Sequence, residues 1–297
     1  IMMAERLGLE VIPIRSEWGK SMNPQLLYDT LKNNSGVKLV SSIHAETSTG
    51  VLQPLDEIVE MTHKFDALFM TDVVTSLSGS ELNFDSWDID YAYGGSQKCL
   101  AAPPGISPVS ISDNALDYIR NRKTLPSSWY FDLSLIIDYW YDKKPHHTAP
   151  VNMIYALREA LSLVMDEGLE NRWDRHKKVS EGLRAGLIAL GLELPISEKD
   201  RLDQLTVISI PENINDVELR NRLLEEYSIE VGRGLGEFQG KVIRIGLMGE
   251  SCNPSNVFTL LNAFEKILPQ LGWEISEGKS LNAANNKFNE SNINYNY

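Results

Sequence analysis

Polar side chains follow three short apolar runs in the first half of the chain, where an active site could form. Residues 44–50 are rich in hydroxyl groups, Asp72 begins a second polar segment, and Lys98 stands in a third, residues 94–100. Such runs are typical of strands, and parallel strands present their carboxyl ends at one edge of a sheet. A carboxylate, an amine and hydroxyl groups would then face one cavity, in which a lysine can act as a nucleophile and a proton carrier.

Each of these residues also has a purely structural interpretation. An aspartate after a strand is often a turn or helix-cap residue, and a lysine in a loop is usually solvated. Lys98, however, stands among small and apolar residues, where a solvated lysine is less expected. The prediction of a site therefore depends on the combination of Asp72, Lys98 and the hydroxyl-rich segment.

The elements that must position these groups alternate between strand-like and helical segments. Strand-like runs lie at residues 11–14, 37–40, 67–70, 91–93 and 106–111, and helical patterns at residues 23–33 and 55–65. Alternation of this kind predicts βαβ units, and hence an α/β fold with a mostly parallel sheet.

The second half has a different pattern, with long helices and few strands. Helical spacing of apolar residues begins at Pro150 and recurs at residues 179–190, 217–227 and 258–268, with strand-like runs at 205–210 and 242–245. We expect a large domain over residues 1–165 and a smaller α+β domain over residues 166–275. Residues 276–297 are polar and rich in asparagine, which predicts a disordered tail.

Composition excludes several classes of protein. The chain has 297 residues and a net charge of −13, which disfavours a nucleic-acid partner, and no apolar run is long enough to cross a membrane. Two cysteines fit a reducing compartment, so we expect a cytoplasmic protein, with an organelle address upstream as the alternative. The chain opens on a helical pattern without a cap, which suggests that its N-terminal part is missing.

Six segments together carry a resemblance to a known family. They are residues 44–54, 72–77, 95–98, 102–105, 146–150 and 243–247. In this order and spacing they resemble class V aminotransferases of the alanine–glyoxylate and serine–pyruvate type. Members of this family are pyridoxal-phosphate (PLP) enzymes of fold type I, and they are usually homodimers with a cofactor site shared between subunits.

The resemblance implies a role for each matching residue around the cofactor. Lys98 corresponds to the lysine that binds PLP covalently, and Asp72 to the partner of the pyridinium nitrogen. Val74 corresponds to the apolar residue on one ring face. Thr47 stands where the family commonly has a serine near the phenolic oxygen, and Gln97 corresponds to a phosphate contact.

Two further roles concern the substrate and the partner subunit. Thr148, in the segment that begins at His146, corresponds to a donor to the partner's phosphate site, although Pro145 replaces the tyrosine common there. Arg244 corresponds to the clamp on the substrate's α-carboxylate, a task that suits a planar guanidinium. The structural alternative is a buried ion pair between Arg244 and a nearby glutamate.

The resemblance implies transfer of an amino group from alanine or serine to a 2-oxo acid such as glyoxylate or pyruvate. A class V lyase of the desulfurase or kynureninase kind is the alternative, but such lyases often have a histidine where Gln97 stands. A nicotinamide-dependent oxidoreductase lacks support because no strand–GxGxxG–helix unit is found. A non-catalytic fragment is the remaining alternative. Cys99, next to Lys98, is expected to be an inert buried thiol and not a reactive one.

Overall fold

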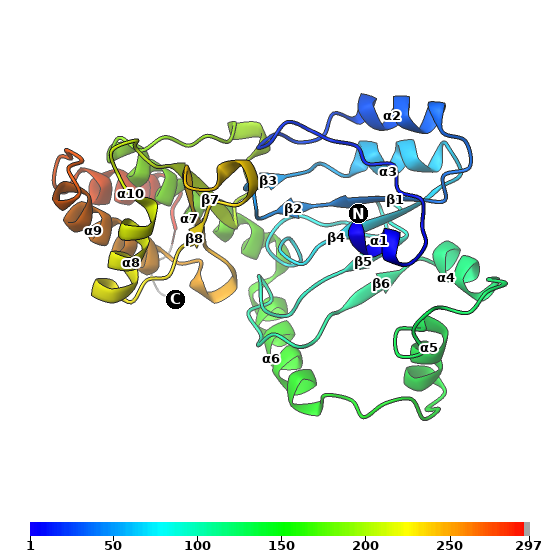
Figure 1. Ribbon diagram of the computed structural model, residues 1–297. Coiled ribbons are helices and arrows are strands. Elements are labelled where there is room, and N and C mark those ends of the chain that lie inside the picture. The colour runs from blue at the N-terminus through cyan, green and yellow to red at the C-terminus, as the bar shows by residue number, and fades with distance from the viewer. Residues whose placement is uncertain (294–297) are drawn as a thin grey trace.

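The large sheet contains four strands, β1 (Leu39–Ile43), β4 (Leu68–Asp72), β5 (Tyr91–Tyr93) and β6 (Val109–Ile111), in the order β1-β4-β5-β6. The computed structural model describes residues 1–293. Strands β1, β4 and β5 are parallel, and β6 pairs antiparallel with β5. Helices α2 (Pro24–Asn33) and α3 (Asp56–His63) lie side by side over this sheet (Figure 1). The predicted α/β architecture is confirmed.

The carboxyl ends of the three parallel strands lie level with one another. Ile43 pairs with Asp72, and Asp72 pairs with Tyr93, so the last residue of each strand stands in one row. Residues paired in this way point to the same face of a sheet. The three polar segments that follow these strands therefore start at one edge.

Helix α2 shows how local sequence sets these elements. The side chain of Asn23 accepts a hydrogen bond from the backbone N–H of Gln25, and Pro24 occupies the first turn, where its missing N–H costs nothing. Leu27 and Leu31, one helical turn apart, are buried against the core of the sheet. The same core contains Phe69 of β4.

The second half packs long helices against a small antiparallel sheet. Its helices are α6 (Val151–Glu167), α7 (Leu169–Ala189), α8 (Asp216–Tyr227) and α9 (Pro254–Gln270); its sheet has the order β7 (Leu205–Ser209), β9 (Val242–Gly246), β8 (Gly232–Arg233). The predicted domain boundary at residues 165/166 falls inside α6, and we keep this division as a proposal. The remaining elements are α1 (Met2–Arg6), β2 (Ala45–Glu46), β3 (Val51–Leu52), α4 (Asp113–Arg120) and α5 (Leu133–Tyr141).

The two halves meet in a shared apolar cluster. Ala45 and Val51 from the first half pack there with Leu205 and Val207 of β7. Gly50 has a positive φ of 76°, and a Cβ at this position would lie 2.7 Å from Val207 Cγ2. Only glycine allows this turn to come so close to the second sheet.

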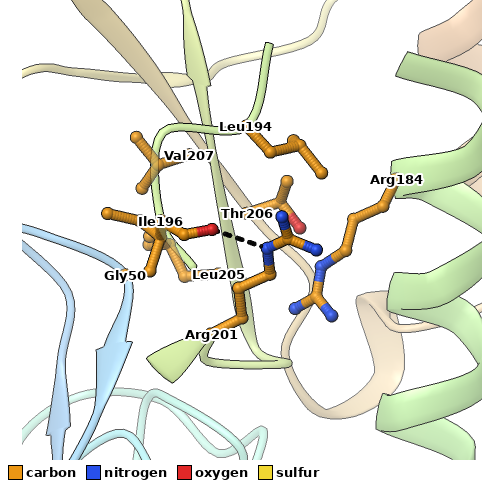
Figure 2. Close-up of a pocket in the computed structure, with 8 residues that line it drawn as sticks. All are labelled: Gly50, Arg184, Leu194, Ile196, Arg201, Leu205, Thr206 and Val207. Carbon is orange, nitrogen blue, oxygen red and sulfur yellow. Dashed lines mark hydrogen bonds between the residues drawn. The ribbon is translucent and has the colours of Figure 1, made fainter. Parts of the chain in front are cut away.

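A narrow cavity of about 10 Å³ lies beside this contact (Figure 2). Arg184 and Arg201 line it, and Arg201 Nε donates a hydrogen bond of 2.8 Å to the carbonyl of Ile196. The volume is that of one water molecule. It is therefore a packing gap of the junction and too small for a substrate.

Two predictions about the chain ends are wrong. Residues 11–14 form no strand, because no neighbouring strand pairs with them among the described residues. The expected disordered tail contains α10 (Lys279–Glu290), which packs on α7 and α9. The ring of Phe288 is completely buried against Gly182, and Glu265 accepts hydrogen bonds from the N–H groups of Gly278 and Ser280 at the start of α10. Residues 294–297 lie outside the described residues.

No helix within residues 1–293 is both long enough and apolar enough to span a bilayer.

His44, directly after β1, is a buried neutral imidazole. Its backbone N–H donates to the carbonyl of Asp72 at 3.0 Å, and its ring meets the ring of Trp87 edge-on at 6.0 Å. Nδ1 has no hydrogen-bond partner in the described part of the chain. Burial lowers the pKa of His44 to about 4. Protonation therefore favours the unfolded chain, in which the imidazole titrates near its ordinary pKa.

We expect the stability of the protein to fall as the pH drops from about 6.5 to about 4, partly because of His44. Unfolded His44 takes up a proton in this window while folded His44 does not, which costs about 2 kcal/mol at pH 5. His44→Phe should reduce the loss of unfolding free energy between pH 7 and pH 5 by that amount, measured by urea titration. The two proteins should respond alike between pH 7 and pH 8. An equal loss at pH 5 in both would contradict the prediction.

Candidate active site

Asp72 ends β4, and its carboxylate is fixed by the turn that follows. Oδ1 accepts a hydrogen bond of 2.8 Å from the backbone N–H of Val74. Tyr93, its neighbour in β5, lies beside the same carboxylate: burial, and then the negative charge and hydrogen bond of Asp72, raise the pKa of Tyr93 to about 12. Asp72 thus stabilises the turn after β4, as expected for a turn residue, and it also places a negative charge at the edge of the sheet.

Lys98 lies in a closed loop after β5. Ala102 N donates to Ser96 O at 2.9 Å, Ala101 N donates to Lys98 O at 2.9 Å, and Ser96 Oγ donates to Pro103 O at 2.6 Å. Ala101 has a positive φ of 59°, which is costly for a residue with a Cβ and typical of strained functional loops. The Lys98 side chain is half-buried, and its amine has no hydrogen bond or ion pair within residues 1–293. The loop therefore holds an uncommitted amine.

Val74 and Gln97 meet over Gly95, so the segments after β4 and β5 converge. A Cβ on Gly95 would lie 3.0 Å from Gln97 Oε1 and 3.1 Å from Val74 Cγ1. The missing side chain lets an apolar group and an amide come together between the two segments. Gln97 is exposed and Val74 half-buried, so both remain accessible.

Arg244 joins the second half of the chain to the segment after β1. Its Nη1 donates to the carbonyl of Thr47 at 2.7 Å, and its Nε donates to the carbonyl of Arg233 at 2.7 Å. Burial lowers the pKa of Arg244, while the charge of Glu46 acts in the opposite direction. The alternative of an ion pair is not found, because no carboxylate contacts this guanidinium in the described part of the chain.

Thr148 is the expected site residue that these contacts do not include. It is exposed in the segment between α5 and α6, next to His147. The neighbouring His146 ring stacks on Trp129 at 4.1 Å, and its Nδ1 is 2.7 Å from Nδ1 of His147. The aromatic residues therefore organise this segment, and the role of Thr148 stays a prediction.

Two residues were missed by sequence reasoning, Tyr93 and Gly95. The signal for Tyr93 was its place at the end of a strand parallel to that of Asp72, and the signal for Gly95 was the glycine pair before Lys98. Cys99, by contrast, behaves as expected for an inert thiol. Burial raises its pKa to about 12, so the thiol stays protonated near neutral pH.

These groups fit PLP and an amino-acid substrate. The uncommitted amine of Lys98 can bind an aldehyde, the carboxylate of Asp72 can stabilise a protonated ring nitrogen, and Val74 offers an apolar surface. Gln97 adds a polar contact, and Gly95 leaves room beside it. The guanidinium of Arg244 suits a carboxylate.

Comparison with known proteins agrees with this chemistry. The family model described as Aminotransferase class-V matches residues 1–247. The chain is 37% identical to the (S)-ureidoglycine–glyoxylate transaminase of Bacillus subtilis, over 95% of this chain and 72% of that protein. It is 40% identical to the alanine–glyoxylate aminotransferase of Callithrix jacchus, over 90% of this chain and 65% of that protein.

A solved structure shows the same fold. The ureidoglycine–glyoxylate aminotransferase of Bacillus subtilis superposes with a TM-score of 0.94 at 38% identity, covering 97% of this chain and 74% of that chain. The chain thus spans between 65% and 74% of the lengths of these relatives. With this family match, the chain belongs to the class V aminotransferases, PLP-dependent transaminases of fold type I.

Proposed function

We propose that this chain moves an amino group from a small amino acid, alanine or serine, to a 2-oxo acid such as glyoxylate or pyruvate. The observation that carries the proposal is the pairing of Asp72 with the end of β5, from which the loop with the uncommitted Lys98 amine begins. Two relatives act on glyoxylate by name, which supports glyoxylate as acceptor. One of them is named for (S)-ureidoglycine, which makes this compound a second candidate donor.

Lys98 and Asp72 carry the chemistry in this proposal. PLP, when bound, supplies an electron sink that stabilises negative charge at the Cα of the substrate. Lys98 Nζ would hold the cofactor, and as a free amine it would accept the proton from the substrate's Cα and donate it to the aldehyde carbon of PLP, the proton shift that transamination requires. Asp72 would keep the proton on the ring nitrogen, because a carboxylate beside that nitrogen stabilises its positive charge.

The other residues bind and orient. Val74 would pack on one ring face of PLP, the hydroxyl of Thr47 would bond near the phenolic oxygen, and Gln97 would contact the phosphate. Arg244 holds the α-carboxylate of the substrate by paired hydrogen bonds, which fixes the position of Cα relative to Lys98.

A lyase reaction is not favoured. The relatives above are named as transaminases, and Gln97 stands where lyases of the family often have a histidine. An oxidoreductase is opposed by the family match, which extends over residues 1–247.

Lys98→Ala should abolish the visible absorbance band that PLP gives when it is bound to a lysine. The protein is purified, PLP is added, and the spectrum is recorded together with transamination of alanine, serine and ureidoglycine against glyoxylate and pyruvate. Lys199→Ala is the control, because Lys199 is exposed and distant in sequence from the site segments. The assignment fails if the band and the activity persist unchanged in Lys98→Ala.

Arg244→Ala should raise KM for the amino donor and lower kcat/KM by roughly 30- to 1000-fold, the cost of losing charge-assisted hydrogen bonds to a carboxylate. A primary amine with the same side chain but no carboxylate provides the control. Its low rate should be the same in both proteins, since Arg244 would have nothing to hold. Equal kcat/KM values for the amino acid would remove Arg244 from this role.

We also propose that two copies of the chain form a homodimer through residues 125–165. Single exposed apolar residues are common, but large apolar patches mark interfaces. Within this region the exposed large apolar residues are Leu125, Trp129, Tyr130, Phe131, Trp140, Tyr141, Val151, Tyr155, Leu161, Leu163 and Met165. Thr148 lies between them, so dimer formation would carry it to the partner, where it could contact the phosphate.

Phe131→Asp combined with Tyr155→Asp should convert the dimer to a monomer, because two carboxylates would be buried unpaired in the interface. Phe131 is 73% exposed and Tyr155 67% exposed in the single chain, so neither change should disturb its fold. Ile188→Asp, at a position 57% exposed on α7, is the control and should leave the dimer intact. Analytical ultracentrifugation measures the mass of each variant, and an unchanged dimer in the double variant would contradict this surface.

A further inference from the structure

A buried charged cluster at the start of α7 contacts the loop that carries Lys98. Arg172 is only 1% exposed. Its Nη2 donates to the carbonyl of Cys99 at 2.8 Å, and its Nη1 donates to Glu167 Oε2 at 2.5 Å. The guanidinium therefore bridges the end of α6 and the carbonyl of Cys99, the residue that follows Lys98.

Arg175 completes the cluster and extends it to the turn that follows β9. Its Nε and Nη2 donate to Glu167 at 2.5 Å and 2.9 Å, while Nη1 donates to the carbonyls of Gly249 and Cys252 at 3.0 Å and 2.6 Å. Burial alone would raise the pKa of Glu167, but the hydrogen bonds and charges of Arg175 and Arg172 hold it below its ordinary value. Glu167 thus stays ionised and binds both guanidinium groups.

His176 links the same turn of α7 to Gly249. Its Nδ1 is 2.7 Å from the carbonyl of Arg172, and its Nε2 accepts the N–H of Gly249 at 3.0 Å. This arrangement requires a neutral ring that donates from Nδ1. Burial lowers the pKa of His176 to about 4, which keeps the ring neutral.

The Lys98 loop rests directly on this turn. Gly249 has a positive φ of 57°, and a Cβ there would lie 2.8 Å from Ala101 Cβ and 3.0 Å from the carbonyl of Cys99. The carbonyl of Cys99 is thus enclosed between Gly249 and the Arg172 guanidinium. If the bond between Arg172 and this carbonyl were lost, a buried donor and a buried acceptor would both be without a partner, which is unfavourable in a low-dielectric interior.

From these contacts we infer that Arg172 is a positioning residue for Lys98. By holding the carbonyl of Cys99, it fixes the backbone next to Lys98 and so limits the positions that the Lys98 amine can take. Through Glu167, Arg175 and Gly249, the same cluster ties this loop to the turn after the strand that carries Arg244. The expected effect on catalysis rests on the proposed function of Lys98. The expected effect on the order of the loop does not depend on that function.

The test compares Arg172→Met with Arg184→Met in the full chain. Arg184 is the matched control: it lies on the same helix, its side chain is 12% exposed, and it bonds to Asp203 and to the carbonyl of Leu202, away from the Lys98 loop. Hydrogen–deuterium exchange of peptides that cover residues 96–103 is measured without PLP. Steady-state kinetics and the absorbance of bound PLP are measured with it.

Arg172→Met should speed exchange in residues 96–103 by at least about tenfold, since a lost anchor lets the loop open locally. It should lower kcat by about 10- to 100-fold, the cost of a misplaced reacting group, while KM changes little. Arg184→Met should do neither. Arg172→Lys keeps one donor for the Cys99 carbonyl and should restore part of both effects.

Equal exchange in this loop for Arg172→Met and Arg184→Met, with equal kcat, would overturn the inference and leave the cluster a purely stabilising one. If Arg172→Met does not fold, Arg172→Lys and Glu167→Gln are compared with Arg184→Lys by the same measurements and the same criteria.

If PLP binds at a residue other than Lys98, Lys98→Ala keeps the absorbance band of bound PLP. That outcome refutes the proposed function, whereas the exchange data still decide the role of Arg172.

Discussion

The level ends of β1, β4 and β5 are the constraint on which the site depends. Because Ile43, Asp72 and Tyr93 are paired across the ladder, the three following segments start at the same height and on known faces. A slip of one residue in β4 would turn Asp72 to the face now occupied by Thr71. The ladder thus sets both the place of the carboxylate and the starting point of the Lys98 loop.

Besides the shared apolar cluster, two arginines of the second half donate hydrogen bonds to main-chain carbonyls that follow the sheet edge. Arg244 donates to the carbonyl of Thr47, and Arg172 donates to that of Cys99. A carbonyl cannot change rotamer, so each bond fixes the course of a backbone and not merely a side chain. This differs from exposed ion pairs such as that of Lys20 and Glu17, which add little stability. Placement of the site therefore requires both halves.

Periodicity predicted most elements because it reports burial, the same quantity that forms them. The helix expected at residues 23–33 is α2, Pro24–Asn33, and the strand run that ends at Asp72 is β4. The hydrogen bonds from arginines to main-chain carbonyls could not be predicted, because every residue has a carbonyl and only the fold determines which one an arginine reaches. The tail was misjudged because its composition is polar, whereas α10 depends on Ala284 and Phe288, one turn apart, and on space left by Gly182.

The distribution of positive charge explains how an acidic chain can bind anions. The chain carries a net charge of −13. A cation at the site can therefore bind an anionic ligand only if it is not already paired with a carboxylate of the protein. Arg172 and Arg175 share Glu167, and the carboxylate of Glu250 lies 3.7 Å from Arg172, so two carboxylates balance these two cations. Lys98 and Arg244 contact no carboxylate within residues 1–293, and both are half-buried, where charges interact more strongly than in water. Carboxylates thus balance the cations that hold the loop, Arg172 and Arg175, whereas the positive charge of Lys98 and Arg244 stays available where an anionic cofactor and a carboxylate substrate would bind.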